Sequence, residues 1–159
     1  MKNPSAIDWN DPAEKVSEFF TVHEALWLPS WRVYHEPSTA DQERIVTFAT
    51  RMDAVREFLD TPIIVHVWTR PLEARVPGSK WDGHNYNAYI GSTSTKSAHI
   101  PGGAMDWHAS GYGGPEKCRE IRSRLIPNLE EFGLRMEDIH GGWIHTDDNP
   151  VGINRFFKP

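Results

Sequence analysis

Residues 97–106 read Ser-Ala-His-Ile-Pro-Gly-Gly-Ala-Met-Asp, and this stretch places two potential metal ligands on either side of a glycine-containing turn. His99 precedes the turn, and Asp106 follows it within a predicted strand over 104–108. His145, in the later segment Gly-Gly-Trp-Ile-His-Thr-Asp, is the natural third ligand. Two imidazoles and one carboxylate form a zinc-type set that leaves a fourth position open, as in catalytic zinc sites. Spacing alone permits this site without requiring it, because the chain has eight histidines and most histidines pack in a core or face solvent.

The same stretch resembles, position for position, the SxHxxGxAxD signature of the peptidase M15 family. Trp143-Ile144-His145 resembles the WxH that supplies the family's third zinc ligand. The resemblance runs from about Pro62 to Pro159 and is closest to the phage-type members that act as endolysins or murein peptidases. It implies one zinc ion per chain and a hedgehog/DD-peptidase fold, in which a small antiparallel sheet packed by helices presents the zinc. It also implies a substrate, the stem peptide of peptidoglycan, cut either at D-alanyl-D-alanine ends or at the L-alanyl-D-glutamate bond.

The resemblance implies a role for Arg70, and the hydroxyl-rich turn before His99 suggests one for Ser97. Arg70 matches the arginine that follows the first core strand and faces the substrate carbonyl in the family, where its charge suits a developing oxyanion. The alternative is a surface arginine that closes a loop. Ser97 is expected to bind carboxylate or amide groups of the substrate, although hydroxyl-rich turns are usually only turns.

The sequence departs from the family pattern at the general base, because Gly142 and Trp143 stand where a Glu, Asp or His is expected. Glu137 is our first choice for this role. If the predicted hairpin has a three-residue loop, Glu137 lies opposite His145 and shares its side of the sheet.

A four-residue hairpin loop would instead oppose Met136 to His145 and leave three alternative bases, His140, Asp138 and Asp147. Asp147 could also orient His145 by accepting a hydrogen bond, the usual arrangement around a metal-bound imidazole.

Regular elements are predicted around these residues. Thr39 and Gln42 have the form of a capping box before a helix over about 40–59, and a β-branched run over 63–68 is typical of a buried strand. A long loop over 71–98 is expected to be functional because of its length. Pro115 begins a second helix that Pro127 interrupts and Gly133 ends, and a hairpin joins 134–138 to 143–147. Residues 1–38 are predicted to be irregular, with one short helix near 23–28.

Composition limits the class of protein. With 159 residues and 38% hydrophobic residues, the chain is expected to form a single α+β domain, and we expect a monomer. A net charge of −5 without a basic run argues against nucleic acid as a partner. We expect no membrane insertion and no signal peptide, so that the protein is made in the cytoplasm and reaches the cell wall after phage-type release or within a virion. The alternative function is a non-catalytic zinc-binding module or virion structural protein on the same scaffold.

The remaining histidines and tryptophans are interpreted as ordinary packing or solvated side chains. His23, His35, His66, His84 and His108 are not expected to bind metal. Trp68, Trp81 and Trp107 lie near the proposed cleft in sequence and could form an aromatic wall for the substrate.

Overall fold

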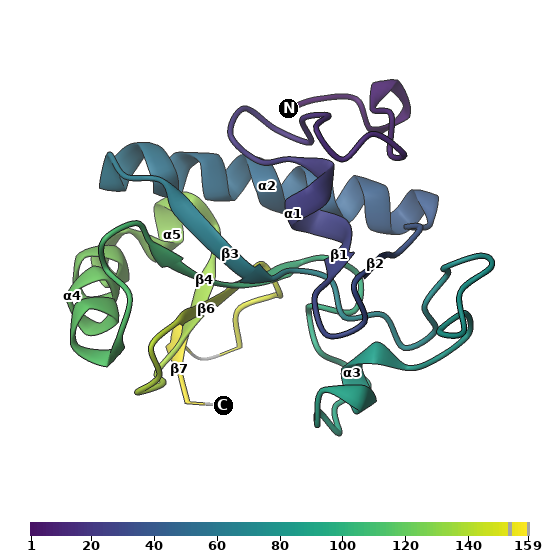
Figure 1. Cartoon of the computed structure of the whole chain (residues 1–159). Coiled ribbons are helices and arrows are strands. Elements are labelled where there is room, and N and C mark those ends of the chain that lie inside the picture. Colours follow the sequence, from purple (N-terminus) through teal and green to yellow (C-terminus); the bar gives the residue numbers. More distant parts are fainter. Residues whose placement is uncertain (153, 159) are drawn as a thin grey trace.

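The longest element of the chain is helix α2 (Thr39–Leu59), which crosses one face of a five-stranded sheet (Figure 1). This computed structural model describes residues 1–152 and 154–158. The strand order across the sheet is β3 (Ile63–Val67), β4 (Ala104–Ala109), β6 (Ile144–Asp147), β5 (Arg135–Glu137) and β7 (Phe156–Phe157). Neighbouring strands are antiparallel except β5 and β7, which are parallel.

The predicted class, a sheet packed by helices, is confirmed, but the sheet is mixed rather than purely antiparallel. The segment after β6 crosses to the far side of β5 and reverses direction, so β7 runs parallel to β5. A separate antiparallel pair joins β1 (Trp27–Leu28) to β2 (Val33–Tyr34). The N-terminal segment also contains the short helices η1 (Pro4–Ala6) and α1 (Val22–Leu26), the second of which was predicted.

The N-cap of helix α2 lies one residue earlier than predicted. Ser38, not Thr39, is the N-cap: its side chain accepts from the Asp41 backbone N–H, and the Asp41 carboxylate accepts from Ser38. A charged carboxylate in the first turn also interacts favourably with the helix dipole, which explains why this pair is used in place of Thr39 and Gln42. The predicted apolar side chains of α2 are buried, and they are Ile45, Phe48, Met52, Val55 and Leu59.

Strand β3 is an edge strand, and the prediction of a buried strand over 63–68 was wrong in this respect. Ile63 is buried, but Ile64 is 44% exposed and His66 is also exposed, because successive side chains point to opposite faces of the sheet and only the face of Ile63 packs on the core. A β-bulge also interrupts its pairing with β4 at His66, between Val65 and Val67.

The C-terminal half follows its predicted boundaries. Helix α4 (Pro115–Leu125) begins at a proline, and Pro127 lies in the 3-10 turn η2 (Ile126–Asn128) that separates it from α5 (Leu129–Phe132). Gly133 ends α5 in the left-handed conformation at a φ of 66°, as a C-terminal glycine commonly does. The hairpin of β5 and β6 then leads to the C-terminal strand.

The long loop over 71–98 contains one helical turn, α3 (Tyr86–Tyr89). Trp81 from this loop stacks on Trp31 with ring centroids 4.7 Å apart, and Tyr86 completes the same apolar cluster. Across residues 1–152 and 154–158, no helix combines the length and apolar character needed to cross a membrane.

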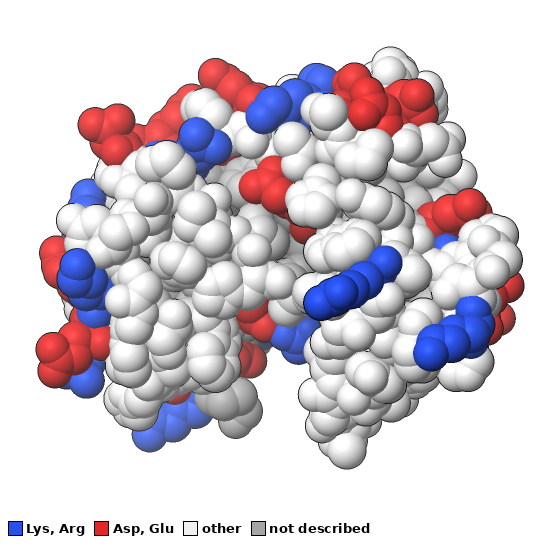
Figure 2. All heavy atoms as spheres, viewed as in Figure 1, with Lys and Arg blue, Asp and Glu red and all other residues white. Residues whose placement is uncertain are grey.

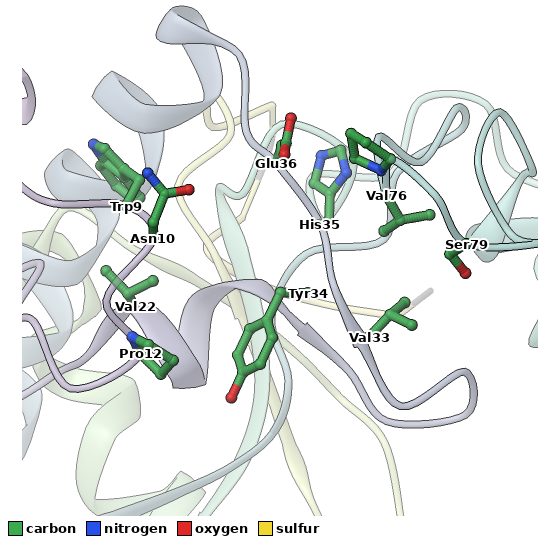
Figure 3. Close-up of a pocket in the computed structure, with 11 residues that line it drawn as sticks. Trp9, Asn10, Pro12, Val22, Val33, Tyr34, His35, Glu36, Val76 and Ser79 are labelled. Atoms are coloured by element: carbon green, nitrogen blue, oxygen red, sulfur yellow. The ribbon is translucent and has the colours of Figure 1, made fainter.

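A cavity of about 360 Å³ lies where the N-terminal segment meets β2 and the 71–98 loop (Figure 3). His35 lines it and is only 4% exposed, and its Nδ1 accepts a hydrogen bond from the Arg75 backbone N–H at 3.0 Å. Burial, followed by the charge of Arg75, lowers the pKa of His35 to about 4. His35 therefore acts as a neutral, packed side chain near pH 7.

Candidate metal centre

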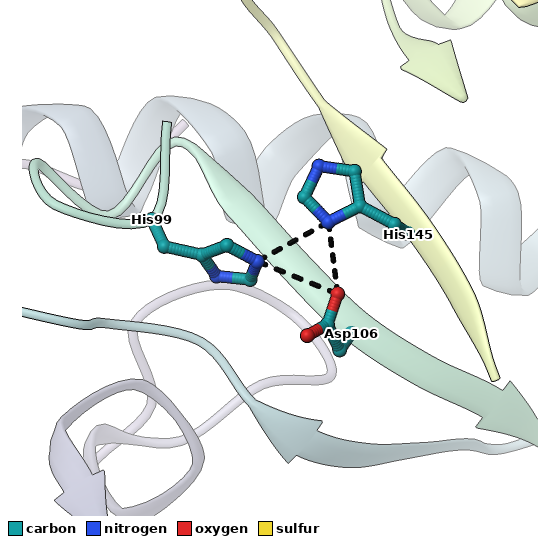
Figure 4. A group of neighbouring side chains, drawn as sticks. All are labelled: His99, Asp106 and His145. Carbon is teal, nitrogen blue, oxygen red and sulfur yellow. Dashed lines mark hydrogen bonds and ion pairs between the residues drawn. The ribbon is translucent and has the colours of Figure 1, made fainter. Parts of the chain in front are cut away.

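Three side chains converge on the open face of the sheet, and they are the predicted ligands His99, Asp106 and His145 (Figure 4). Asp106 and His145 are cross-strand partners on β4 and β6, so their side chains lie next to each other. His99 reaches them from the turn that precedes β4. One nitrogen or oxygen atom of each residue lies within 4.8 Å of the other two, so the group could hold a metal ion.

The distances among the donor atoms fit a single ion. His99 Nε2 lies 3.2 Å from His145 Nδ1, and Asp106 Oδ1 lies 2.8 Å from His145 Nδ1 and 3.4 Å from His99 Nε2. Two ligand atoms bound tetrahedrally to one zinc ion, at bonds of about 2.0 to 2.1 Å, would be about 3.3 Å apart. The observed spacings bracket this value, and two imidazoles with a carboxylate suit zinc among the divalent metals.

His99 is oriented by the backbone of the segment that follows β3. Its Nδ1 lies 2.6 Å from the Trp68 carbonyl oxygen, and its own carbonyl accepts from the Arg70 backbone N–H at 3.0 Å. The turn also requires Gly102, which has a φ of 78° and whose added Cβ would lie 2.5 Å from Ile45 Cγ1. The glycine of the motif therefore lets the turn pack closely on α2.

His145 is oriented by a carboxylate rather than by the backbone. Its Nε2 lies 3.6 Å from Asp147 Oδ2, and Arg135 holds Asp147 with two contacts, Nε to Oδ1 at 2.8 Å and Nη2 to Oδ2 at 3.0 Å. Arg135 and Asp147 are cross-strand partners on β5 and β6. Asp147 thus has the geometry of the orienting residue that the sequence offered as an alternative.

The pKa values of the three residues depend on one another. Burial raises the pKa of Asp106, but hydrogen bonds with His145 and His99 outweigh burial and hold the pKa of this carboxyl well below its usual range. Burial lowers the pKa of His145, whereas its bonds to Asp106 and Asp147 raise it to about 9. For His99, burial is the largest influence and lowers the pKa. The cluster therefore keeps an ionised carboxylate and attracts positive charge.

The three residues lie in a cavity of about 540 Å³ that is open to solvent. Figure 2 shows a cleft between the side of the molecule that carries β6 and β7 and the side that carries α3, with charged side chains at its back. Ser92, Ser94, Lys96 and Ser97 line one part of this cavity, and Glu137, Trp143 and Phe157 line another. A peptide could therefore approach the group from outside.

Arg70, Ser97 and Glu137 all line this cavity. The Arg70 guanidinium pairs through Nη2 with Asp106 Oδ2, the oxygen that does not face the histidines. Ser97 Oγ accepts a hydrogen bond from the His99 backbone N–H at 3.3 Å. The observed register, with Met136 opposite Thr146, places Glu137 opposite His145, as the three-residue loop predicted.

Of the three alternative general bases, Asp147 alone lines the metal cavity among the described residues. Asp147 lines the cavity but is bound by Arg135, His140 is exposed at the hairpin tip, and Asp138 lines a separate hollow near the C-terminus. Among the described residues, the metal cavity is lined by neither His140 nor Asp138.

The aromatic wall differs from the sequence interpretation. Trp68 and Trp107 are fully buried in the core, and Trp81 packs on Trp31, so these three do not line the metal cavity. Trp143, 43% exposed, lines it instead. The sequence interpretation also missed Arg135, although the register that pairs Glu137 with His145 also pairs Arg135 with Asp147.

Comparison of the chain with family models, with curated proteins and with solved structures found no match.

Proposed function

We propose that this chain is a zinc-dependent peptidase that hydrolyses amide bonds in the peptides of the bacterial cell wall, on a scaffold of the hedgehog/DD-peptidase type. One observation carries the proposal: a zinc-type donor set lies in an open cavity that an arginine and a glutamate also line. The likeness of residues 97–106 and 143–145 to peptidase M15 motifs supports the choice of substrate.

His99 Nε2, Asp106 Oδ1 and His145 Nδ1 would hold the zinc, because these are the atoms that face one another. When bound, zinc supplies Lewis-acid chemistry for amide hydrolysis. Trp68 and Asp147 keep the two imidazoles in place through their outer nitrogens.

Glu137 acts as the general base. It lies opposite His145 in the hairpin register and lines the cavity, whereas the carboxylate of Asp147 is bound by Arg135. Its carboxylate takes the proton of the attacking water and returns it to the leaving amine.

Arg70 stabilises the negative charge that develops on the scissile carbonyl oxygen. Its pairing with Asp106 fixes the guanidinium at the edge of the donor set, where it keeps a positive charge beside the cavity. Ser97 and the neighbouring hydroxyls on the same wall bind carboxylate or amide groups of the stem peptide. The likeness to phage-type members supports an endolysin-like role.

The proposal is tested by incubating the zinc-loaded protein with purified murein and identifying new peptide termini by mass spectrometry. We expect new amino or carboxyl termini within the stem peptide, lost after chelation and restored by added zinc. Stoichiometric zinc without any new terminus would contradict the peptidase and favour a non-catalytic zinc-binding module.

A further inference from the structure

A second pair of histidines lies on the same face of the sheet as the metal centre. His66 Nε2 and His108 Nδ1 are 2.6 Å apart; His66 is exposed and His108 is half-buried. His108 follows Asp106 by two residues on β4, so the two side chains project from the same face. The pair is thus a neighbour of the proposed zinc ligands but uses none of them.

The β-bulge in β3 brings this pair together. Val65 is opposite Trp107 and Val67 is opposite Asp106, so His66 is an extra residue without a partner of its own. Bulges re-aim a side chain, and they are frequent beside functional sites. Here the bulge directs the His66 ring to His108 instead of to the donor set around Asp106.

The pair repeats the geometry of the two proposed zinc histidines. In both pairs an Nε2 atom faces an Nδ1 atom; the ring centroids are 4.8 Å apart for His66 and His108 and 4.9 Å apart for His99 and His145. The angles between the rings are 58° and 60°. Two imidazole nitrogens that face each other on adjacent strands form a chelating pair for a divalent transition metal.

The two sites differ in how rigidly they are held. His99 is fully buried and bonded to the Trp68 carbonyl, whereas His66 is exposed on an edge strand. Binding one tetrahedral ion requires the two nitrogens to separate from 2.6 Å to about 3.3 Å, which a small rotation of His66 achieves. With only two protein ligands, such an ion keeps further positions for water or for a carboxylate of a bound ligand.

We propose that His66 Nε2 and His108 Nδ1 form a second, solvent-accessible site for a divalent transition-metal ion such as Zn²⁺, beside the site of His99, Asp106 and His145 and independent of it. The remaining positions of this ion bind water or a carboxylate group of a molecule from solution. This site does not require the chain to be a peptidase.

Zinc stoichiometry after equilibrium dialysis against excess Zn²⁺ tests the proposal. We expect two zinc ions per wild-type chain, one in His66→Gln, one in His108→Gln and one in His99→Ala, where the second site remains. The matched control His84→Gln, which removes an exposed histidine outside both pairs, should retain two. Cadmium NMR of the Cd²⁺-loaded protein should show two resonances, one of which disappears in His66→Gln.

A wild-type chain that saturates at one zinc ion would overturn the site, as would a second ion that persists in both glutamine variants or is lost in His84→Gln. Circular dichroism checks that each variant is folded. If one of the two glutamine variants does not fold, the other is enough for the test. None of these readouts measures hydrolysis, so failure of the second site and failure of the peptidase are distinguishable.

Discussion

The Nδ1 atom of His99 donates a hydrogen bond to the backbone carbonyl oxygen of Trp68 across 2.6 Å. Because a carbonyl oxygen can only accept, Nδ1 must carry the proton, and the lone pair of His99 is on Nε2, which faces Asp106 and His145. The backbone at the end of β3 thus selects the tautomer that a metal ligand needs before any ion binds.

The first prediction concerns metal content. His99→Ala should bind zinc at the main site far more weakly, because it removes the buried imidazole that the Trp68 carbonyl holds in place for the three-ligand set. Elemental analysis after dialysis measures this loss, with His99→Ala made in a His66→Gln background so that the second histidine pair cannot hold the ion. His84→Ala, which alters an exposed histidine, should keep the metal. An alanine variant at 99 that retains zinc bound by Asp106 and His145 would remove His99 from the ligand set.

Arg70→Ala should lower turnover of a stem-peptide substrate by about 10²-fold, the scale for loss of one oxyanion donor. Zinc content should be retained, because Arg70 contacts the Asp106 oxygen that faces away from the histidines. Arg70→Lys keeps a cation beside Asp106, so its turnover should lie between those of the wild type and of Arg70→Ala. Steady-state kinetics with metal analysis checks this, and unchanged turnover in the alanine variant would return Arg70 to a structural role.

Glu137→Gln should lower hydrolysis by roughly 10² to 10⁴-fold while zinc remains bound, because an amide of nearly the same volume cannot take the proton of water. Asp138→Asn is the matched control: it makes the same chemical change at the next residue, which does not line the metal cavity among the described residues. Full activity of Glu137→Gln would transfer the role to Asp147, the other carboxylate near His145.

A pH dependence of stability follows from His35. Its pKa is about 4 when folded and about 6.5 when unfolded, so the unfolded chain binds more protons between these values and stability falls as pH is lowered from 6.5 to 4. The gap corresponds to about 3 kcal/mol. The Asn side chain of His35→Asn can still accept a hydrogen bond from the Arg75 backbone N–H but does not titrate. Between pH 6.5 and 4, the free energy of unfolding of this variant, measured by urea denaturation, should therefore fall by about 3 kcal/mol less than that of the wild type. Parallel pH profiles for the two proteins would refute the assignment.

A comparison of Gly102 with Gly111 separates two costs of adding a side chain in a turn: the positive φ and the close contact with α2. Both have a φ of 78°, but a Cβ at Gly102 would lie 2.5 Å from Ile45 whereas one at Gly111 meets nothing within 4 Å. Gly111→Ala should cost about 1 kcal/mol for its backbone conformation, and Gly102→Ala about 1 to 3 kcal/mol more for overpacking. Urea denaturation measures both, and equal losses would show that the close approach to α2 costs nothing.

Much of the fold was predictable where the deciding contacts are local. The apolar spacing of α2, the proline that begins α4 and the glycine that ends α5 each act through residues within a few positions along the chain. The start of α2 was misplaced by one residue because Ser38 with Asp41 and Thr39 with Gln42 carry the same pattern, and only the charge of Asp41 separates them.

The candidate site was also predictable only in part from the sequence. The sequence determined which three residues could be ligands, since His99, Asp106 and His145 fall in motifs that resemble known zinc ligands, and it limited the general base to a few candidates on one hairpin. The sequence left two hairpin loop lengths open, and the observed register selected the three-residue loop.

Only the tertiary structure decided the contacts between segments that are distant in sequence. These include the Trp68 carbonyl that orients His99, the parallel pairing of β7 with β5, and the bulge that places His66 beside His108. Each depends on which strands become neighbours and in what register, and that choice minimises the free energy of the whole core. A periodic pattern in one segment reports which face is apolar, but it carries no record of the segment that will cover that face or leave it open.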